Sequence, residues 1–128
     1  MLRAIVGVVG GLISWVLIAT IGNVAIRLAW PAYSEVEAAM GFTPAMMLAR
    51  LFLGALASLG AGLACARITK GNGRAIAVLA GVLFAVFIPV HYGLWDRFPL
   101  WYHLAFLLSL LVITLLGGML FRSRDRAA

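Results

Sequence analysis

The stretch PLWYHLAFLLSLLVITLLGGMLF, residues 99–121, contains no Asp, Glu, Lys or Arg. At 1.5 Å per residue, a helix of about 20 apolar residues crosses the hydrocarbon core of a bilayer, so this stretch predicts a membrane-spanning helix. Three more apolar runs lie upstream, at about residues 4–29, 44–66 and 75–95. The sequence therefore predicts an all-α integral membrane protein with four transmembrane helices in an antiparallel bundle.

The composition also indicates a protein surrounded by lipid. The chain of 128 residues is 65% hydrophobic and only 11% charged, with a mean hydropathy of +1.11, whereas soluble domains average about 45–50% apolar and about 25% charged residues. We expect one membrane domain over residues 1–128. The first run is expected to remain as an uncleaved span, because its apolar part of about 18 residues exceeds the 7–15 of a signal-peptide core.

The net charge of +6 does not indicate nucleic-acid binding. The basic residues stand singly between apolar runs and form no groove interleaved with aromatic residues, so no nucleic-acid partner is expected. The single cysteine, Cys65, excludes an internal disulfide and any CxxC motif for redox chemistry or zinc.

The connection between the first two spans has signals of a short helix of its own. Pro31 ends the first span, and Ser34 and Glu37 have the spacing of a capping box. Thr43 and Pro44 are suited to be the cap and first residue of the next span. We therefore expect a short helix at the membrane interface between the first and second spans.

The basic residues also predict the orientation. Four spans place both termini on one side, and that side would carry seven of the ten Arg and Lys residues: Arg3, Arg67, Lys70, Arg74, Arg122, Arg124 and Arg126. The other side would carry Arg27, Arg50 and Arg97. By the positive-inside rule, both termini are expected in the cytoplasm. The composition, rich in Arg and Ala and poor in Lys, favours a bacterial inner membrane.

Small residues recur every four positions along three of the spans. The stripes are Gly7 with Gly11, Gly10 with Ser14, Gly54 with Ser58 and Gly62, and Ala77 with Gly81 and Ala85. Such stripes let helix backbones approach closely in lipid, where no hydrophobic effect draws helices together. We interpret them as seams within the bundle or between copies of the chain.

The outer half of the first span carries polar residues on one face. Thr20, Asn23 and Arg27 follow helical spacing and are expected to face protein. Arg50 is expected about 9 Å inside the second span, at 1.5 Å per residue. Glu35 and Glu37 are its expected partners. Arg50 could snorkel to the interface, bind an anionic head group or carboxylate together with Arg27, or line a proton or ion pathway.

The segment PVHYGLWDRFPLWYH, residues 89–103, contains both histidines of the chain. Pro89 should kink the third span and open a gap beneath His91, and a helical hairpin would bring His103 to the same surface together with Asp96 and Arg97. Each histidine alone is best explained as an interfacial residue satisfied by backbone or water. No HxxxH or HExxH spacing is present, so a metal is not expected there. A bis-histidine haem needs ligands on facing helices with a slot between them, and both histidines would lie too near one interface for that.

These expectations lead to one functional hypothesis and two alternatives. The leading hypothesis is a non-enzymatic binding or accessory protein whose outer-leaflet pocket takes a lipid head group, a quinone-like molecule or a segment of a partner. The expected pocket residues are Arg27, Glu35, Glu37, Arg50, His91, Asp96, Arg97 and His103, with Thr20 and Asn23 as polar lining.

The alternatives are a small oligomeric transporter or channel lined by Asn23 and Arg50, and a metal- or haem-dependent membrane enzyme. The expected partners are the bilayer, a lipid or small apolar ligand, and further copies of the chain or a larger membrane complex. No cofactor is expected.

Overall fold

The computed structural model describes residues 1–127, which contain helices and no strand. Four long helices, α1 (Leu2–Ala29), α3 (Pro44–Thr69), α4 (Gly73–Gly93) and α5 (Leu100–Ala127), are joined by short connections. A short helix, α2 (Pro31–Glu37), lies between α1 and α3. Each long helix is long and apolar enough to cross a membrane. The prediction of an all-α, four-span membrane protein with a short helix after the first span is confirmed.

Local signals explain where the helices begin and end. The Thr43 side chain accepts a hydrogen bond from the Met46 amide at 3.3 Å, and Pro44 begins α3, as the sequence predicts. Lys70 ends α3 in the left-handed region, with φ of 55°. The Asn72 side chain then accepts bonds from the Arg74 and Ala75 amides and caps α4.

The predicted capping box in the short helix is wrong. Pro31 is the first residue of α2, so Ser34 and Glu37 lie inside that helix and not at its start. Pro31 fits this place because its fixed φ suits the first turn of a helix and its missing amide hydrogen would have no partner there. Ser34 and Glu37 bind the end of α1 instead.

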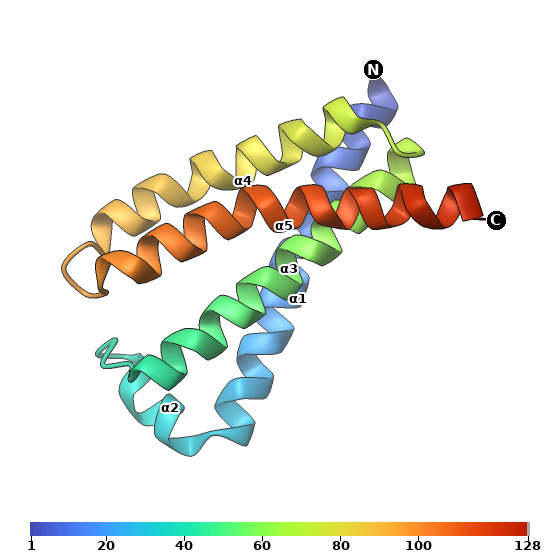
Figure 1. Cartoon of the computed structure of the whole chain (residues 1–128). Coiled ribbons are helices and arrows are strands. Elements are labelled where there is room, and N and C mark those ends of the chain that lie inside the picture. The colour runs from blue at the N-terminus through green and yellow to red at the C-terminus, as the bar shows by residue number, and fades with distance from the viewer. Residues whose placement is uncertain (128) are drawn as a thin grey trace.

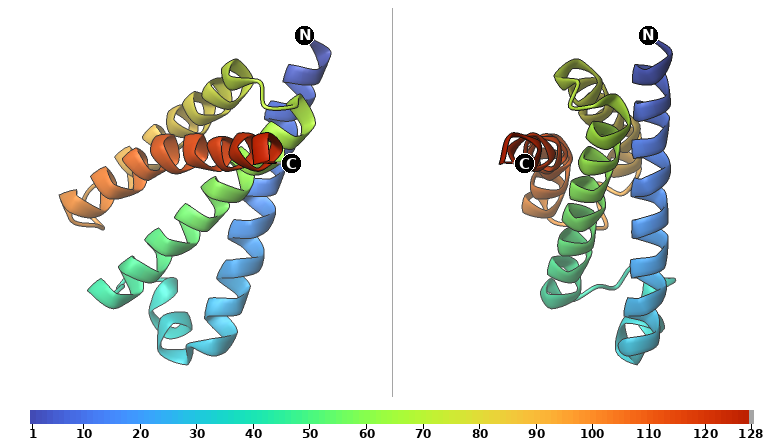
Figure 2. Two further views of the ribbon diagram at one scale, coloured as in Figure 1. Left: turned by 45° about the vertical axis from the view of Figure 1, so that its right-hand side comes forward. Right: turned by 90° about the vertical axis from the view of Figure 1, so that its right-hand side faces the viewer.

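The four long helices form two antiparallel hairpins, α1 with α3 and α4 with α5 (Figure 1). The hairpins cross where α3 packs on α5, and they diverge toward the end that carries α2 and the α4–α5 turn (Figures 1 and 2). We call this the α2 end. Both termini and the α3–α4 turn lie at the other end (Figure 1).

Glycines allow backbone contact where the hairpins cross. A Cβ added to Gly62 would collide with the Thr114 carbonyl of α5, and one added to Gly117 would collide with the Leu59 carbonyl of α3. Gly11 similarly lies against the Ala61 carbonyl, at 3.1 Å from where its Cβ would be. The predicted seams on the first two spans therefore lie between helices of one chain.

The third predicted seam faces outward. Ala77, Gly81 and Ala85 are exposed on α4, and a Cβ at Gly81 would meet no described atom within 4 Å. Within the chain this stripe packs on nothing among residues 1–127, so its role between copies stays a prediction. Gly117 and Gly118 of α5 pack closely, against Leu59 of α3 and Ile76 of α4, although the predicted stripes do not include them.

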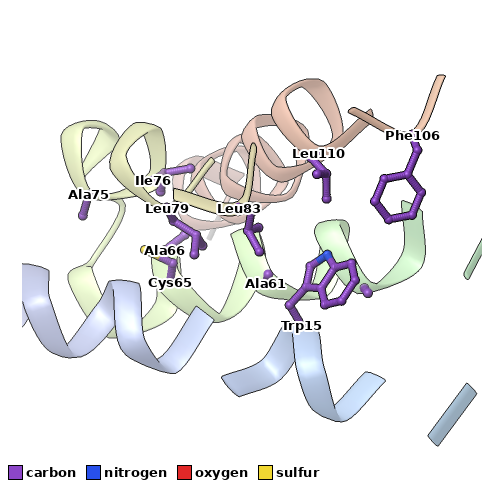
Figure 3. Packing of buried hydrophobic residues seen from close by; sticks show 11 residues of the cluster. Trp15, Ala61, Cys65, Ala66, Ala75, Ile76, Leu79, Leu83, Phe106 and Leu110 are labelled. Carbon is purple, nitrogen blue, oxygen red and sulfur yellow. The ribbon is translucent and has the colours of Figure 1, made fainter. Parts of the chain in front are cut away.

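A core joins the four long helices beyond the crossing. Ala61 and Cys65 of α3, Leu79 of α4 and Leu110 of α5 are fully buried. Trp15 extends from α1 toward Phe106 at the edge of the same cluster (Figure 3). The core fills the middle of the molecule, and a second buried cluster joins the hairpins at the α2 end, formed by Tyr33, Phe42, Met46, Phe98 and Tyr102.

Candidate functional site

Arg50 lies at the α2 end, between the two hairpins. It follows Pro44, the first residue of α3, by six positions, or about 9 Å of helix. Its Nη1 donates to the Tyr33 hydroxyl at 2.7 Å, and its Nε donates to the Tyr102 hydroxyl at 3.3 Å. Its guanidinium also lies 4.7 Å from the centre of the Phe42 ring. Arg50 is thus held by aromatic residues.

The expected partnership of Arg50 with Glu35 and Glu37 is wrong. The carboxylate of Glu37 pairs with Arg27 of α1 and accepts bonds from its Nε at 2.8 and 2.9 Å. Glu35 is exposed on α2 and forms no hydrogen bond with residues 1–127. Two tyrosine hydroxyls replace the expected acids because α2 turns the fully buried Tyr33 inward and Glu35 outward.

Tyr33 and Asn23 extend the network from Arg50 to α1. The Tyr33 hydroxyl accepts from Arg50 and donates to Asn23 Oδ1 at 3.1 Å. A chain of side chains therefore runs from Asn23 through Tyr33 and Arg50 to Tyr102. It ties α1, α2 and α3 to α5, so one network connects the two hairpins.

The ion pair of Arg27 and Glu37 fastens α2 to the end of α1. The Ser34 hydroxyl adds a bond to the Arg27 carbonyl at 2.9 Å. The Arg27 guanidinium holds the pKa of the Glu37 carboxyl below its ordinary value, mainly through their hydrogen bonds. This pair is partly solvent-exposed and its two charges cancel, whereas Arg50 forms no salt bridge with an acid of residues 1–127.

An open cleft of about 390 Å³ lies below Arg50. It combines polar residues of α1 and α3 with aromatic residues of α1, α4 and α5. Its lining consists of Trp15, Ala19, Thr20, Asn23, Val24, Arg27, Arg50, Leu53, Gly54, Phe87, Tyr102 and Phe106. The predicted polar face of Thr20, Asn23 and Arg27 thus faces this cleft.

The deep end of the cleft is apolar. Trp15 lies 12 residues before Arg27, so the cleft extends about 18 Å along α1. The Trp15 indole donates to Ser58 Oγ at 3.1 Å, and Ser58 donates to the Gly54 carbonyl at 2.8 Å. Trp15 also packs on Phe87, with ring centres 4.8 Å apart. The polar atoms at this depth are therefore already paired, and the floor presents aromatic surface.

A second cavity of about 580 Å³ lies on the other side of Arg50, beneath α2. We call it the vestibule; it is lined by Asn23, Arg27, Ser34, Glu37, Ala38, Met40, Phe42 and Arg50. Asn23, Arg27 and Arg50 also line the cleft. The three residues therefore line both cavities, of which the cleft is the more apolar.

The unused hydrogen-bond donors around Arg50 define what can bind. A guanidinium has five N–H donors, and those of Arg50 make two bonds with residues 1–127. The Tyr102 hydroxyl accepts from Arg50 and still has its own hydrogen to donate. An unneutralised cation with spare donors, above an aromatic floor, is suited to an oxyanion that carries an apolar tail.

His91 and His103 lie behind the cleft as a buried pair. Their Nδ1 atoms are 2.7 Å apart, and Nε2 of His103 lies 3.3 Å from the Trp95 carbonyl. A carbonyl can only accept, so Nε2 of His103 carries a hydrogen, and a neutral His103 then accepts at Nδ1 from His91. The sequence predicts that backbone or water satisfies the hydrogen bonding of each histidine. The backbone does so for His103, through the Trp95 carbonyl, and the two histidines also hydrogen-bond to each other.

The predicted gap beneath His91 is wrong. α4 continues through Pro89 to Gly93, and the His91 ring packs on Phe106 with ring centres 4.7 Å apart. Neither histidine lines the cleft or the vestibule. Phe106 and Tyr102 separate the pair from the cleft, so the histidines support its wall.

The remaining candidates lie at the surface. Asp96 is exposed in the α4–α5 turn and forms no hydrogen bond with residues 1–127. Arg97 is also exposed and donates to the Ala39 carbonyl at 3.5 Å. The ten candidates thus fall into three sets: residues of the two cavities (Thr20, Asn23, Arg27, Glu37, Arg50), a buried pair (His91, His103) and surface residues (Glu35, Asp96, Arg97).

Sequence reasoning missed the tyrosines that hold Arg50. Neither Tyr33 nor Tyr102 is among the predicted site residues, although their hydroxyls carry the network. Trp15, at the floor, was not singled out either. A single sequence offers no signal for these roles, because Tyr102 is 52 positions from Arg50 and tyrosines are common at membrane interfaces whatever they bind.

Metal ligands do not cluster in the described part of the chain: residues 1–127 contain no group of three or more His, Cys, Asp or Glu that could hold an ion. No family model, curated protein or solved structure matches the chain.

Proposed function

We propose that the chain is a non-enzymatic binding protein of a bacterial inner membrane, which holds an anionic amphiphile in the cleft between its hairpins. The anionic head group binds Arg50 and the apolar tail lies over Trp15, Phe87 and Phe106. One observation carries the proposal: Arg50 lies inside the α2 end with spare donors and pairs with no acid of residues 1–127.

The depth of the cleft in the membrane supports this placement of the head group and the tail. A head group stays near the interface while its tail extends toward the bilayer centre, and the cleft changes from polar to apolar in the same direction. With seven of ten basic residues at the other end, the positive-inside rule places both termini in the cytoplasm and the cleft in the outer leaflet. The chain acts as one domain, because the core joins both hairpins.

Native mass spectrometry of the full chain, extracted in mild detergent, tests the proposal. We expect the wild-type protein to retain an anionic amphiphile and Arg50→Gln to lose it. Arg97→Gln is the matched control, because it removes the same charge from the same end but outside both cavities. Equal retention by wild type and Arg50→Gln would refute the proposal.

A transporter is the second candidate. It is favoured by the position of Asn23 and Arg50 between two cavities. It is disfavoured by the core, where Ala61, Leu79 and Leu110 are fully buried between the cleft and the other end. Flux of an anionic solute in reconstituted vesicles, present in wild type and lost in Arg50→Ala but retained in His91→Ala, would favour transport over binding.

A further inference from the structure

The size and lining of the vestibule indicate which class of anionic amphiphile fits the site. Cleft and vestibule meet at Asn23, Arg27 and Arg50. A fatty acid would end with its carboxylate at Arg50 and would leave the vestibule, at about 580 Å³ the larger of the two cavities, to water. A ligand that continues beyond its anionic group would fill both.

The net charge where the cleft meets the vestibule favours one kind of phosphate group. Arg27 and Glu37, both in the vestibule, neutralise each other. Arg50 is therefore left with one net positive charge at the boundary. A phosphodiester carries one negative charge, whereas a phosphate monoester carries about 1.5 to 2 at pH 7. The single unpaired cation favours the diester.

The polar groups of the vestibule include both donors and acceptors. Asn23 accepts from Tyr33 through Oδ1 and keeps its two amide hydrogens. The Ser34 hydroxyl donates to the Arg27 carbonyl and can still accept. Glu37 has lone pairs beyond those used by Arg27. Hydroxyl groups, which both donate and accept, match this set, and a choline head group, which has no donor, does not.

We propose that the ligand is a phosphodiester lipid with a hydroxylated head group. Its phosphate binds Arg50, its acyl chains enter the cleft and its head group occupies the vestibule. This inference rests on the proposed function, because it assumes that an anionic amphiphile binds at Arg50.

Titration of the full-length protein in detergent with four probes tests the assignment: dioleoyl phosphatidylglycerol, dioleoyl phosphatidic acid, dioleoyl phosphatidylcholine and oleate. We expect phosphatidylglycerol to bind at least fivefold more tightly than each of the others. Glu37→Gln and Ser34→Ala should reduce that preference over phosphatidic acid to less than twofold. Ser34→Ala should leave the affinity for phosphatidic acid unchanged, whereas Glu37→Gln should raise it, because Arg27 is then no longer neutralised. Ser34→Ala keeps the test open if loss of the Arg27–Glu37 pair prevents Glu37→Gln from folding.

The outcomes separate this inference from the proposed function. Equal binding of all the anionic probes, with loss in Arg50→Gln, overturns the hydroxylated head group and leaves anion binding in place. Tighter binding of oleate or phosphatidic acid, or a preference that persists in both vestibule variants, also overturns it. Wild-type affinity for phosphatidylglycerol in Arg50→Gln would overturn both proposals.

Discussion

At the scale of single residues, two tyrosine hydroxyls bind Arg50 in place of the two expected carboxylates. Glu35 and Glu37 would have neutralised Arg50, whereas Tyr33 and Tyr102 orient its guanidinium and leave its charge unpaired. An arginine so deep in a membrane protein is costly unless it has partners. The hydroxyls satisfy part of its hydrogen bonding, and the remaining capacity is what makes Arg50 a binding group.

Tyr33→Phe should lower the free energy of unfolding by about 1–3 kcal/mol, because it removes one of the two hydrogen bonds of Arg50 and leaves Asn23 Oδ1 without its partner. Tyr92→Phe is the control, since Tyr92 is 81% exposed. Chemical unfolding in a fixed detergent measures both. A Tyr33→Phe protein as stable as Tyr92→Phe would show that the network contributes little.

The pH dependence of stability should depend on Glu37. Its pKa is lowered in the folded state by Arg27, so the stabilisation is fully present above the ordinary carboxyl pKa of about 4.3. It is lost as the pH falls through the lower, folded-state pKa. Wild type should therefore have a higher Tm than Glu37→Gln at pH 7, and the difference should shrink as the pH falls through the lowered pKa of Glu37. A difference that does not change with pH would contradict this assignment.

At the scale of elements, the hairpins are held together by backbone contact and diverge beyond it. Local signals in the sequence predict the helix boundaries well: Thr43 and Pro44 start α3 as expected because a cap depends on adjacent residues. The capping box failed because Pro31 starts α2 earlier than the Ser34 spacing implies. The spacing of small residues does not show how each helix is rotated about its axis. It therefore cannot tell which stripes of small residues pack inside the chain and which face outward.

Two glycine substitutions test the crossing. Gly62→Ala should destabilise the protein by about 1–3 kcal/mol or more, because its Cβ collides with the backbone carbonyl of Thr114. Gly81→Ala should be neutral or stabilise by up to about 1 kcal/mol, since alanine is the better helix former and the site is open. Thermal unfolding of the two variants compares them directly. A Gly62→Ala protein as stable as Gly81→Ala would contradict the packing of α3 on α5.

At the scale of the whole molecule, the sequence predicts the fold and part of the site. The four spans follow from runs of apolar residues, and Thr20, Asn23 and Arg27 reach the cleft because helical spacing puts them on one face. The sequence cannot give the divergence of the hairpins, which creates the cavities. Nor can it show that Phe106 and Tyr102 exclude the histidines from the cleft, because that depends on contacts between α4 and α5.

The orientation in the membrane is testable with single cysteines. In a Cys65→Ala background, Ala38→Cys should react with an impermeant maleimide added outside intact cells, and Asn72→Cys should react only after the cells are opened. Both positions are exposed and lie at opposite ends of the molecule. External labelling of residue 72 alone would place the cleft in the inner leaflet.

The central claim is that Arg50 holds an anionic amphiphile whose tail lies over Trp15. Trp15 can be made the only tryptophan of the chain by replacing Trp30, Trp95 and Trp101 with Phe. Its fluorescence is then followed in vesicles of unlabelled phosphatidylcholine, to which phosphatidylglycerol with brominated acyl chains is added in trace amounts. Bromine quenches tryptophan only on contact.

We predict quenching that saturates near one brominated lipid per chain, persists in Arg97→Gln and is lost in Arg50→Gln. Quenching that rises in simple proportion to the brominated fraction of the bilayer, and that is the same in Arg50→Gln, would contradict the claim.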